Sequence, residues 1–267
     1  MNRAAVAADK AQDSTAFRVA ARIGYVVLGL LHLLIGAVAV AIATGAGGGD
    51  ADQGGALQQV RAAPAGTLLL WVVVVGLAAL AVWQIAEAVA ERDGDAKKRW
   101  GYRAKDVGTA LAYGAIAATA FTVATGGRSD SSESSQTLSA QILTMPGGEA
   151  VLVVVGLGVA AIGVAFVIRG ITRAFEKRMS LPSGAAGHGI RTFGTVGYVA
   201  KGVAVGVAGV LFVVAAVTHD PNAAGGIDAA LRSLARLPLG QFVLWLVGAG
   251  LIVYGVFCFA RARYARM

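Results

Sequence analysis

Residues 238–261 read PLGQFVLWLVGAGLIVYGVFCFAR, and this stretch decides the fold because it occurs three times in the chain. Counted from its proline, a glycine follows two positions later, a second glycine twelve positions later and a charged residue twenty-three positions later. The other two copies begin at Pro64 and Pro146. Between proline and charge each copy is long and almost entirely apolar, which is typical of a membrane-spanning helix.

The composition favours the same class of protein. Of the 267 residues, 57% are hydrophobic and only 14% are charged, whereas a soluble protein carries about a quarter charged residues. The single cysteine, Cys258, excludes an intrachain disulfide framework, and the three histidines have no metal-ligand spacing. We therefore expect no metal and no cofactor. The net charge of +8 would suggest nucleic acid in a soluble protein, but here we expect the basic residues at the membrane surface and no nucleic-acid partner.

Six apolar runs predict six spans, at residues 19–44, 66–90, 104–125, 148–172, 194–217 and a last one that closes at 261. At about 1.5 Å per residue, each run covers the roughly 30 Å hydrocarbon core. The small residues at 41–43 resemble a signal-peptidase site, but the first run is longer than the apolar h-region of a signal peptide and belongs to the repeated set, so we interpret it as a retained helix. Between the spans, the end of segment 45–64 predicts one or two interfacial turns. We expect a Ser-rich loop at 126–147 and a flexible connector at 173–194.

The spans group into three helical-hairpin repeats, at 19–92, 99–173 and 191–264, after a cytoplasmic tail at 1–18. The first helices match as well, since the pair Gly24-Tyr25 with two later glycines aligns without gaps on Gly197-Tyr198 and its two later glycines. Each repeat has two spans, so all three have the same orientation and are related only by an axis along the membrane normal. The predicted fold class is an all-α membrane protein with pseudo-threefold symmetry about that normal.

The distribution of Lys and Arg predicts the topology. Eighteen of them fall in the two termini and the connections between repeats, and four fall in the connections within repeats. Because cytoplasmic segments are enriched in Lys and Arg, both termini are predicted to be cytoplasmic, in a multi-pass protein of a bacterial inner membrane.

Three transmembrane hairpins, each with a glycine-rich first helix and a Pro-x-Gly second helix, resemble the family called Domain of Unknown Function 1206. The resemblance covers roughly residues 17–264. It implies a bacterial membrane protein in which a pair of helices occurs three times. The family has no established activity or catalytic residues, so the resemblance implies no function.

The glycines inside the spans need a reason, because each is unfavourable in a helix by about 1 kcal/mol relative to alanine. Small residues allow close approach of helix backbones in lipid, where hydrophobic exclusion does not drive association. We interpret them as helix-packing glycines, with a narrow pore lined by backbone as the alternative. They are Gly29, Gly36, Gly76, Gly158, Gly202, Gly209 and Gly250.

His32 is the most notable polar residue, because it lies near the middle of the first span. An ionisable group there is costly and usually faces the interior of the bundle. Three interpretations remain open: structural packing, handling of a proton or ligand, and ligation of a cofactor, which the lack of a second mid-span histidine disfavours. With Gln84 and Glu87, His32 forms the candidate intramembrane polar site.

Other charged residues are expected near the cytoplasmic interface, where snorkelling and mutual salt bridges would satisfy them. They are Glu87, Arg22, Lys105, Asp106, Arg169 and Lys201. The alternative is a charged cytoplasmic vestibule on the pseudo-threefold axis.

No catalytic motif occurs in a suitable context, so we expect no enzyme. The leading hypothesis is a structural or accessory membrane protein, in contact with the lipid bilayer and with other membrane proteins or a second copy of itself. The rival is a pathway for a small solute, an ion or a proton through the helix bundle.

Overall fold

The computed structural model describes residues 15–46, 51–64, 66–90, 96–127 and 130–265. Within these residues every secondary-structure element longer than one residue is a helix. Six of these helices are long and apolar enough to cross a membrane. The predicted all-α architecture with six membrane-length helices is confirmed. Most of the predicted tail, at 1–14, lies outside the described residues, and the first helix includes its last four positions.

The six long helices are α2 (Thr15–Ala43), α4 (Gly66–Ala90), α5 (Ala96–Ala124), α7 (Gly148–Ile171), α8 (Gly184–Thr218) and α10 (Gly240–Tyr264). The prediction of a flexible connector at 173–194 is wrong, because this segment holds the short helix η1 (Ala174–Arg178) and the first turns of α8. Its last glycine, Gly194, serves packing, since a Cβ there would overlap the ring of Phe175. Glycine-rich composition therefore marked a close contact here.

A short helix joins the two spans of each repeat: α3 (Gln53–Ala62), α6 (Ser131–Leu143) and α9 (Gly226–Ala235), the last preceded by η2 (Pro221–Ala223). The interfacial turns predicted before Pro64 correspond to α3, whereas the Ser-rich segment expected as a loop contains α6. Asp130 caps α6 by accepting hydrogen bonds from the backbone N–H groups of Ser132 and Glu133. Ser134, Ser135 and Ser139 donate to carbonyls one turn earlier, so their hydroxyls are satisfied within the helix.

The Pro-x-Gly motif forms the same turn in every repeat. The N–H of the glycine donates to the carbonyl three residues earlier, at 2.7–2.9 Å, for Gly66, Gly148 and Gly240. A Cβ on any of these glycines would overlap the carbonyl oxygen six residues earlier in the connector helix. Only glycine therefore fits this corner, and the motif is the device that folds each connector helix back onto its second span.

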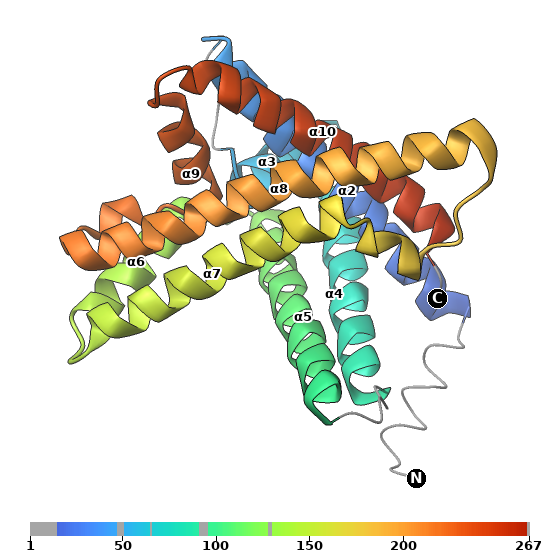
Figure 1. The fold of residues 1–267 in the computed structure, drawn as a ribbon, viewed down its shortest axis with the longest axis horizontal. Helices are drawn as coiled ribbons and strands as arrows, with labels where there is room; N and C mark the ends of the chain where they lie inside the picture. Colours follow the sequence, from blue (N-terminus) through green and yellow to red (C-terminus); the bar gives the residue numbers. More distant parts are fainter. Residues whose placement is uncertain (1–14, 47–50, 65, 91–95, 128–129, 266–267) are drawn as a thin grey trace.

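The long helices pack in three pairs, α2 with α10, α4 with α5 and α7 with α8. Each pair joins the second span of one repeat to the first span of the next, with the third repeat returning to the first, and the three pairs run in different directions in Figure 1. Within a repeat, α2 packs on α4 and α8 packs on α10, but α5 and α7 form no comparable interface in the described chain. The predicted pseudo-threefold arrangement about the membrane normal therefore stays a prediction.

Glycine seams hold two of these pairs together at backbone distance. Between α2 and α10, a Cβ at Gly29 would lie 2.8 Å from the carbonyl oxygen of Gly255, and one at Gly36 would lie 2.6 Å from that of Gly248. Between α7 and α8, the facing pairs are Gly156 with Gly209 and Gly163 with Gly202. Contact this close requires that neither helix carries a side chain at the crossing.

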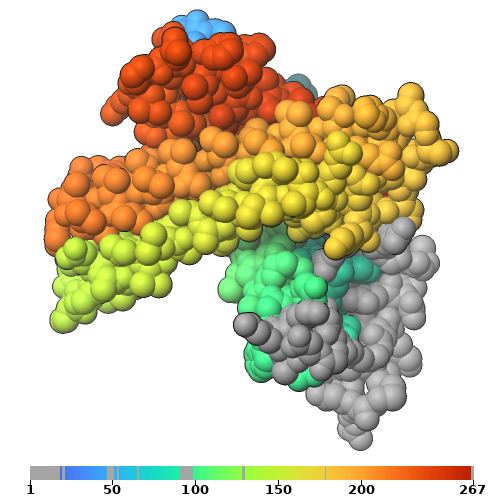
Figure 2. All heavy atoms as spheres, in the orientation of Figure 1, coloured from blue at the N-terminus to red at the C-terminus, as the bar shows by residue number. Residues whose placement is uncertain are grey.

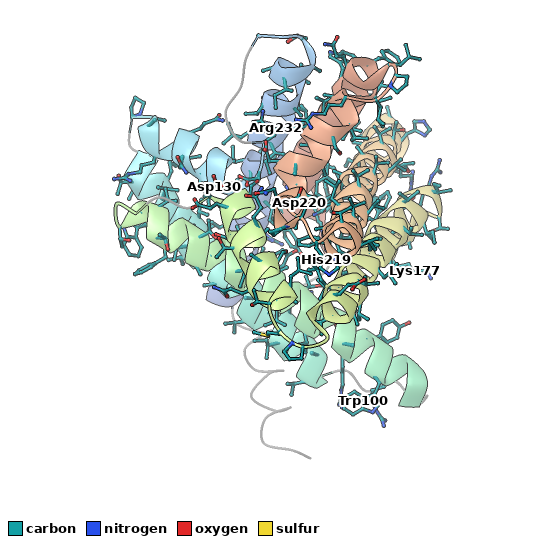
Figure 3. The ribbon with its side chains drawn as sticks, turned by 90° about the vertical axis from the view of Figure 1, so that its left-hand side faces the viewer. Trp100, Asp130, Lys177, His219, Asp220 and Arg232 are labelled. Atoms are coloured by element: carbon teal, nitrogen blue, oxygen red, sulfur yellow. The ribbon has the colours of Figure 1, made fainter. Side chains whose placement is uncertain are left out.

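The connector helices are tied to one another at one end of the bundle. A carboxylate oxygen of Asp228 in α9 accepts a hydrogen bond from the N–H of Ala51, just before α3, at 2.8 Å. The Ser132 hydroxyl of α6 donates to the carbonyl of Gly225, just before α9, at 2.8 Å. Figure 3 shows Asp130, Asp220 and Arg232 gathered in this region, far from Trp100 at the start of α5.

Candidate functional site

The most distinctive internal feature is a cluster of five aromatic side chains, which we call the aromatic cluster. It comprises Tyr25 of α2, Phe175 of η1, Tyr198 of α8, and Tyr254 and Phe257 of α10, all of them buried. Tyr198 lies at its centre, stacked on Phe175 at a centroid distance of 5.5 Å and edge-on to Tyr254 at 5.2 Å. The cluster therefore joins three long helices and the connection between the second and third repeats.

The Gly-Tyr pair of the first and third repeats has its explanation here. A Cβ at Gly197 would lie 2.6–2.9 Å from backbone and Cβ atoms of Tyr254, and one at Gly24 would lie 2.5 Å from the carbonyl oxygen of Gly76. In the first and third repeats this glycine therefore allows the first span to pack closely on the second span of the same repeat. The tyrosine that follows it, Tyr198 or Tyr25, turns into the cluster.

Three cationic side chains surround the aromatic cluster. The Arg261 guanidinium lies 4.5 Å from the Tyr25 ring and donates to the Tyr198 hydroxyl at 3.4 Å. The Arg169 guanidinium lies 5.4 Å from the Tyr198 ring, and Lys201 Nζ lies 4.7 Å from the Tyr254 ring. Tyrosine faces attract cations, most strongly where water is excluded. Arg169 and Lys201, expected to form salt bridges, contact aromatic rings instead.

The segment after α7 covers this cluster on the side of the chain termini. Phe175 is 2% exposed and packs edge-on against Phe257, with the ring centroids 5.2 Å apart. Met179 is buried and pairs with Ala265, and the N–H of Ser180 donates to the carbonyl of Tyr264 at 2.8 Å. The connection is thereby fastened to the end of α10 and closes the cluster.

His32 lies deeper along α2 and is buried. Its Nδ1 atom is 2.7 Å from the carbonyl oxygen of Leu28, one turn earlier on the same helix. Its ring meets that of Tyr254 edge-on at 4.7 Å. The Nδ1 atom of this imidazole is therefore satisfied by the backbone of its own helix, and the ring packs against an aromatic neighbour.

Gln84 and Glu87 both lie on α4, the first buried and the second partly buried. In the described part of the chain no hydrogen bond or ion pair joins either of them to His32. The three-residue intramembrane polar site therefore stays a prediction. Of the other predicted interfacial charges, Lys105 and Asp106 form an ion pair at 2.7 Å, whereas Arg22 is exposed.

The predicted packing glycines fall into two groups. Six lie against another helix: Gly29, Gly36, Gly76, Gly202, Gly209 and Gly250. Gly158 differs, because a Cβ there would meet no atom within 4 Å. Sequence analysis missed Gly156 and Gly163, although they are seven residues apart like the predicted seam glycines.

The convergence of aromatic and cationic side chains was also missed. One signal was present, because Arg169 and Arg261 occupy the same position twenty-three residues after their prolines. Among the described residues no three His, Cys, Asp or Glu side chains come together as metal ligands, and Cys258 is buried. The chemistry that this arrangement offers is recognition of negative charge and tight packing.

The chain matches the family model described as Domain of Unknown Function (DUF1206) three times, at residues 23–91, 105–173 and 196–265. It belongs to this family. It is also similar to an uncharacterized protein of Bacillus subtilis (strain 168), YxxB, with 30% identity over 250 residues, which cover 92% of this chain and 90% of that protein. No solved structure matches the chain. This DUF1206 protein is therefore a membrane protein of a family whose function is uncharacterised.

Proposed function

We propose that this DUF1206 protein is a structural or accessory component of the bacterial inner membrane that acts by packing, and neither as a transporter nor as an enzyme. The observation that carries the proposal is the environment of His32, the one histidine near the middle of a span. Its Nδ1 bonds to the carbonyl of Leu28 and its ring packs on Tyr254. A relay or ligand site would need a polar group joined to the ring, and among the described residues no side chain forms a hydrogen bond with it.

The helix contacts around His32 support the same proposal. Gly29 and Gly36 flank it on α2, and both face glycine carbonyls of α10 at less than 3 Å from an added Cβ. Leu31 and Ile35, its neighbours in sequence, are 2% and 3% exposed. Backbones this close leave no room for a water-filled passage between α2 and α10.

A protein that acts by packing also needs apolar helix faces that its own helices do not cover. The spans of the second repeat are the least covered. In the most apolar part of the spans, 22% of α5 and 17% of α7 is buried, against 39–50% for the other four. In Figure 2, α7 is visible along its length, with no other segment lying over it. Lipid covers such faces by default, and they are where another membrane protein or a second copy would dock.

The orientation proposed with this function places both termini in the cytoplasm. The support is the charge asymmetry of eighteen Lys and Arg against four. The connector helices would then face the outside, and η1 with the aromatic cluster would lie at the cytoplasmic side.

Cysteine labelling tests both proposals. His32→Cys in a Cys258→Ser background is treated with a membrane-impermeant maleimide in intact and permeabilised cells. We expect no labelling from either side, because the site is sealed. Labelling at position 32, in protein that elutes as a folded species, would overturn the packing role and favour a pathway.

Two exposed positions provide the controls in the same background. Ser134→Cys in α6 is expected to react in intact cells, and Lys177→Cys in η1 only after permeabilisation. The reverse pattern would overturn the proposed orientation without affecting the result at position 32.

One observation favours the rival pathway for a proton or small ion. His32, Tyr254 and Lys201 form a continuous row, with His32 against Tyr254 at 4.7 Å and Lys201 over the same ring at 4.7 Å. If the row conducts protons, His32→Leu would abolish proton leak across vesicles that contain the wild-type protein. We expect no such leak from either protein.

A further inference from the structure

We propose that Arg169, Lys201 and Arg261 form a binding site for a phosphate group, supplied by the headgroup of an anionic phospholipid. Their cationic groups converge on two neighbouring tyrosines. Arg169 lies over the ring of Tyr198, Arg261 donates to its hydroxyl, and Lys201 lies over the adjacent ring of Tyr254. The two rings are 5.2 Å apart.

These three cations converge on one pair of rings although no carboxylate among the described residues pairs with them. Elsewhere Arg191 pairs with Glu176 at 3.1 Å, and Arg232 pairs with Asp228 at 2.7 Å. Across the described residues none of Arg169, Lys201 and Arg261 forms an ion pair with Asp or Glu. Three like charges in a water-poor site repel one another, so an anion would stabilise the arrangement.

Two buried polar atoms beside the cluster lack a partner. The Nε of Arg169 is buried and has no hydrogen-bond acceptor in the described part of the molecule. The hydroxyl of Thr195, one turn before Tyr198 on α8, is likewise buried without a partner. Both are donors, and Gly170, next to Arg169, packs on the carbonyl of Thr195. Unpartnered buried donors beside unpaired cations indicate a missing acceptor.

The chemistry of these donors selects phosphate. The planar guanidinium fork matches two oxygens of a phosphate group, and a lysine adds a point charge. Hydroxyls of tyrosine and threonine can donate to the remaining oxygens. A carboxylate has two oxygens, whereas this group of donors can address more than two.

The position of the site favours a lipid over a soluble anion. Arg169 and Arg261 lie in the last turn of α7 and near the end of α10, at headgroup depth. Phe175 and Met179 cover the cluster on the side of the termini. Arg169 is partly exposed on α7, whose outer side carries no other helix. A headgroup can therefore approach from the bilayer, past α7.

The test compares lipid binding to purified wild-type protein and variants in detergent, by native mass spectrometry with added phosphatidylglycerol. Arg169→Gln is expected to weaken binding about tenfold, the effect of losing one charge-assisted hydrogen bond. Arg169→Lys, which keeps the charge, should lose about threefold. The matched control Lys177→Gln removes an exposed charge from the same end of the molecule and should change the affinity less than twofold.

Inorganic phosphate alone, added over a concentration series, distinguishes the two sources. The lipid assignment is overturned by three results together: inorganic phosphate binds the wild-type protein, it does not bind the Arg169→Gln variant, and phosphatidylglycerol does not bind the wild-type protein. Equal phosphatidylglycerol affinity for Arg169→Gln and Lys177→Gln would overturn the site itself. Without lipid the three cations repel one another, so removing one of them should not destabilise the protein. The lipid-free Arg169→Gln variant should therefore unfold at a temperature no lower than that of the wild type. Earlier unfolding would contradict that premise.

Discussion

The middle repeat and its two neighbours share a motif but pack differently. In the first repeat Gly76 of α4 meets Gly24 of α2, and in the third Gly250 of α10 meets Ala200 of α8. Gly158, at the same position of the middle repeat, touches nothing beyond its own helix. Forty residues before its proline, where the first repeat has Gly24, the middle repeat has Asp106. A repeated glycine thus predicts a contact only when its partner surface is repeated too.

The comparison also separates two kinds of repeated feature. The Pro-x-Gly corner is local, so all three copies form it in the same way. The contact between the first and second spans of a repeat depends on two helix surfaces. Among the described residues no comparable contact forms in the middle repeat, where the surface of the first span differs. The four predictions below use matched positions in different repeats, and all are measured as free energies of unfolding in detergent, by SDS titration followed by circular dichroism.

The largest effect is expected at the corner glycines. Gly148→Ala should destabilise the protein by about 3 kcal/mol, because its Cβ overlaps the carbonyl oxygen of Ile142 and the corner must open. Gly66→Ala and Gly240→Ala should lower the free energy of unfolding by about the same amount. A loss in one repeat but not in the others would show that the three corners are not equivalent.

Next come the connector helices, seven residues before each proline, where all three side chains are buried. Leu231→Ala in α9 should cost about 2 to 3 kcal/mol, since it empties a fully buried position. Ser139→Ala in α6 should cost about 1 kcal/mol or less, because it removes only a bond to the carbonyl of Ser135. Equal losses would mean that α6 is packed as tightly as α9.

The seam glycines test the comparison directly. Gly76→Val should cost about 2 kcal/mol, because a branched side chain would separate α4 from α2. Gly158→Val should stay within about 0.5 kcal/mol of wild type, since its position is open. If Gly158→Val is the more damaging change, an unseen partner or a second copy covers that face of α7.

The smallest effect concerns the middle residue of the Pro-x-Gly corner, which adopts positive φ in two repeats. Leu239 has φ +60°, whereas Gly147 has φ +75° at the matching place. Leu239→Gly should therefore stabilise the protein by about 1 kcal/mol, and Gly147→Ala should destabilise it by a similar amount. Changes of the same sign at both positions would contradict this account of the corner.

Much of the architecture was predictable from the chain. The proline-to-charge spacing predicted second spans that begin at Gly66 and Gly148, and α4 and α7 begin at those glycines. The last span was predicted to close at Arg261, and α10 ends three residues later, at Tyr264. Prediction failed where polar or glycine-rich sequence forms helix. Ser-rich α6 satisfies its hydroxyls on its own backbone, and the first turns of α8 use glycine for contact with Phe175. Composition alone does not distinguish these uses from a loop.

The candidate site was only partly predictable, for a different reason. His32 was identified because an ionisable residue within an apolar run is rare, and it is buried as expected of such a residue. Its contact with Tyr254 depends on α10 lying beside α2, which joins the first and third repeats. Gln84 and Glu87 were grouped with it as polar residues within or at the end of an apolar run, and such a pattern does not say which neighbour each residue contacts.

The sequence by itself determined the number of spans and the glycine corners at which the second spans begin. These follow from short-range physics, since a backbone in lipid must satisfy its own hydrogen bonds and a corner without space for a Cβ requires glycine. Only the tertiary structure decided which helices pair, and so which charges meet the aromatic cluster. Pairing depends on the fit of two surfaces that can lie more than 200 residues apart in the chain, as at Gly36 and Gly248. In lipid, where hydrophobic exclusion does not drive one helix onto another, differences in that fit select the partner.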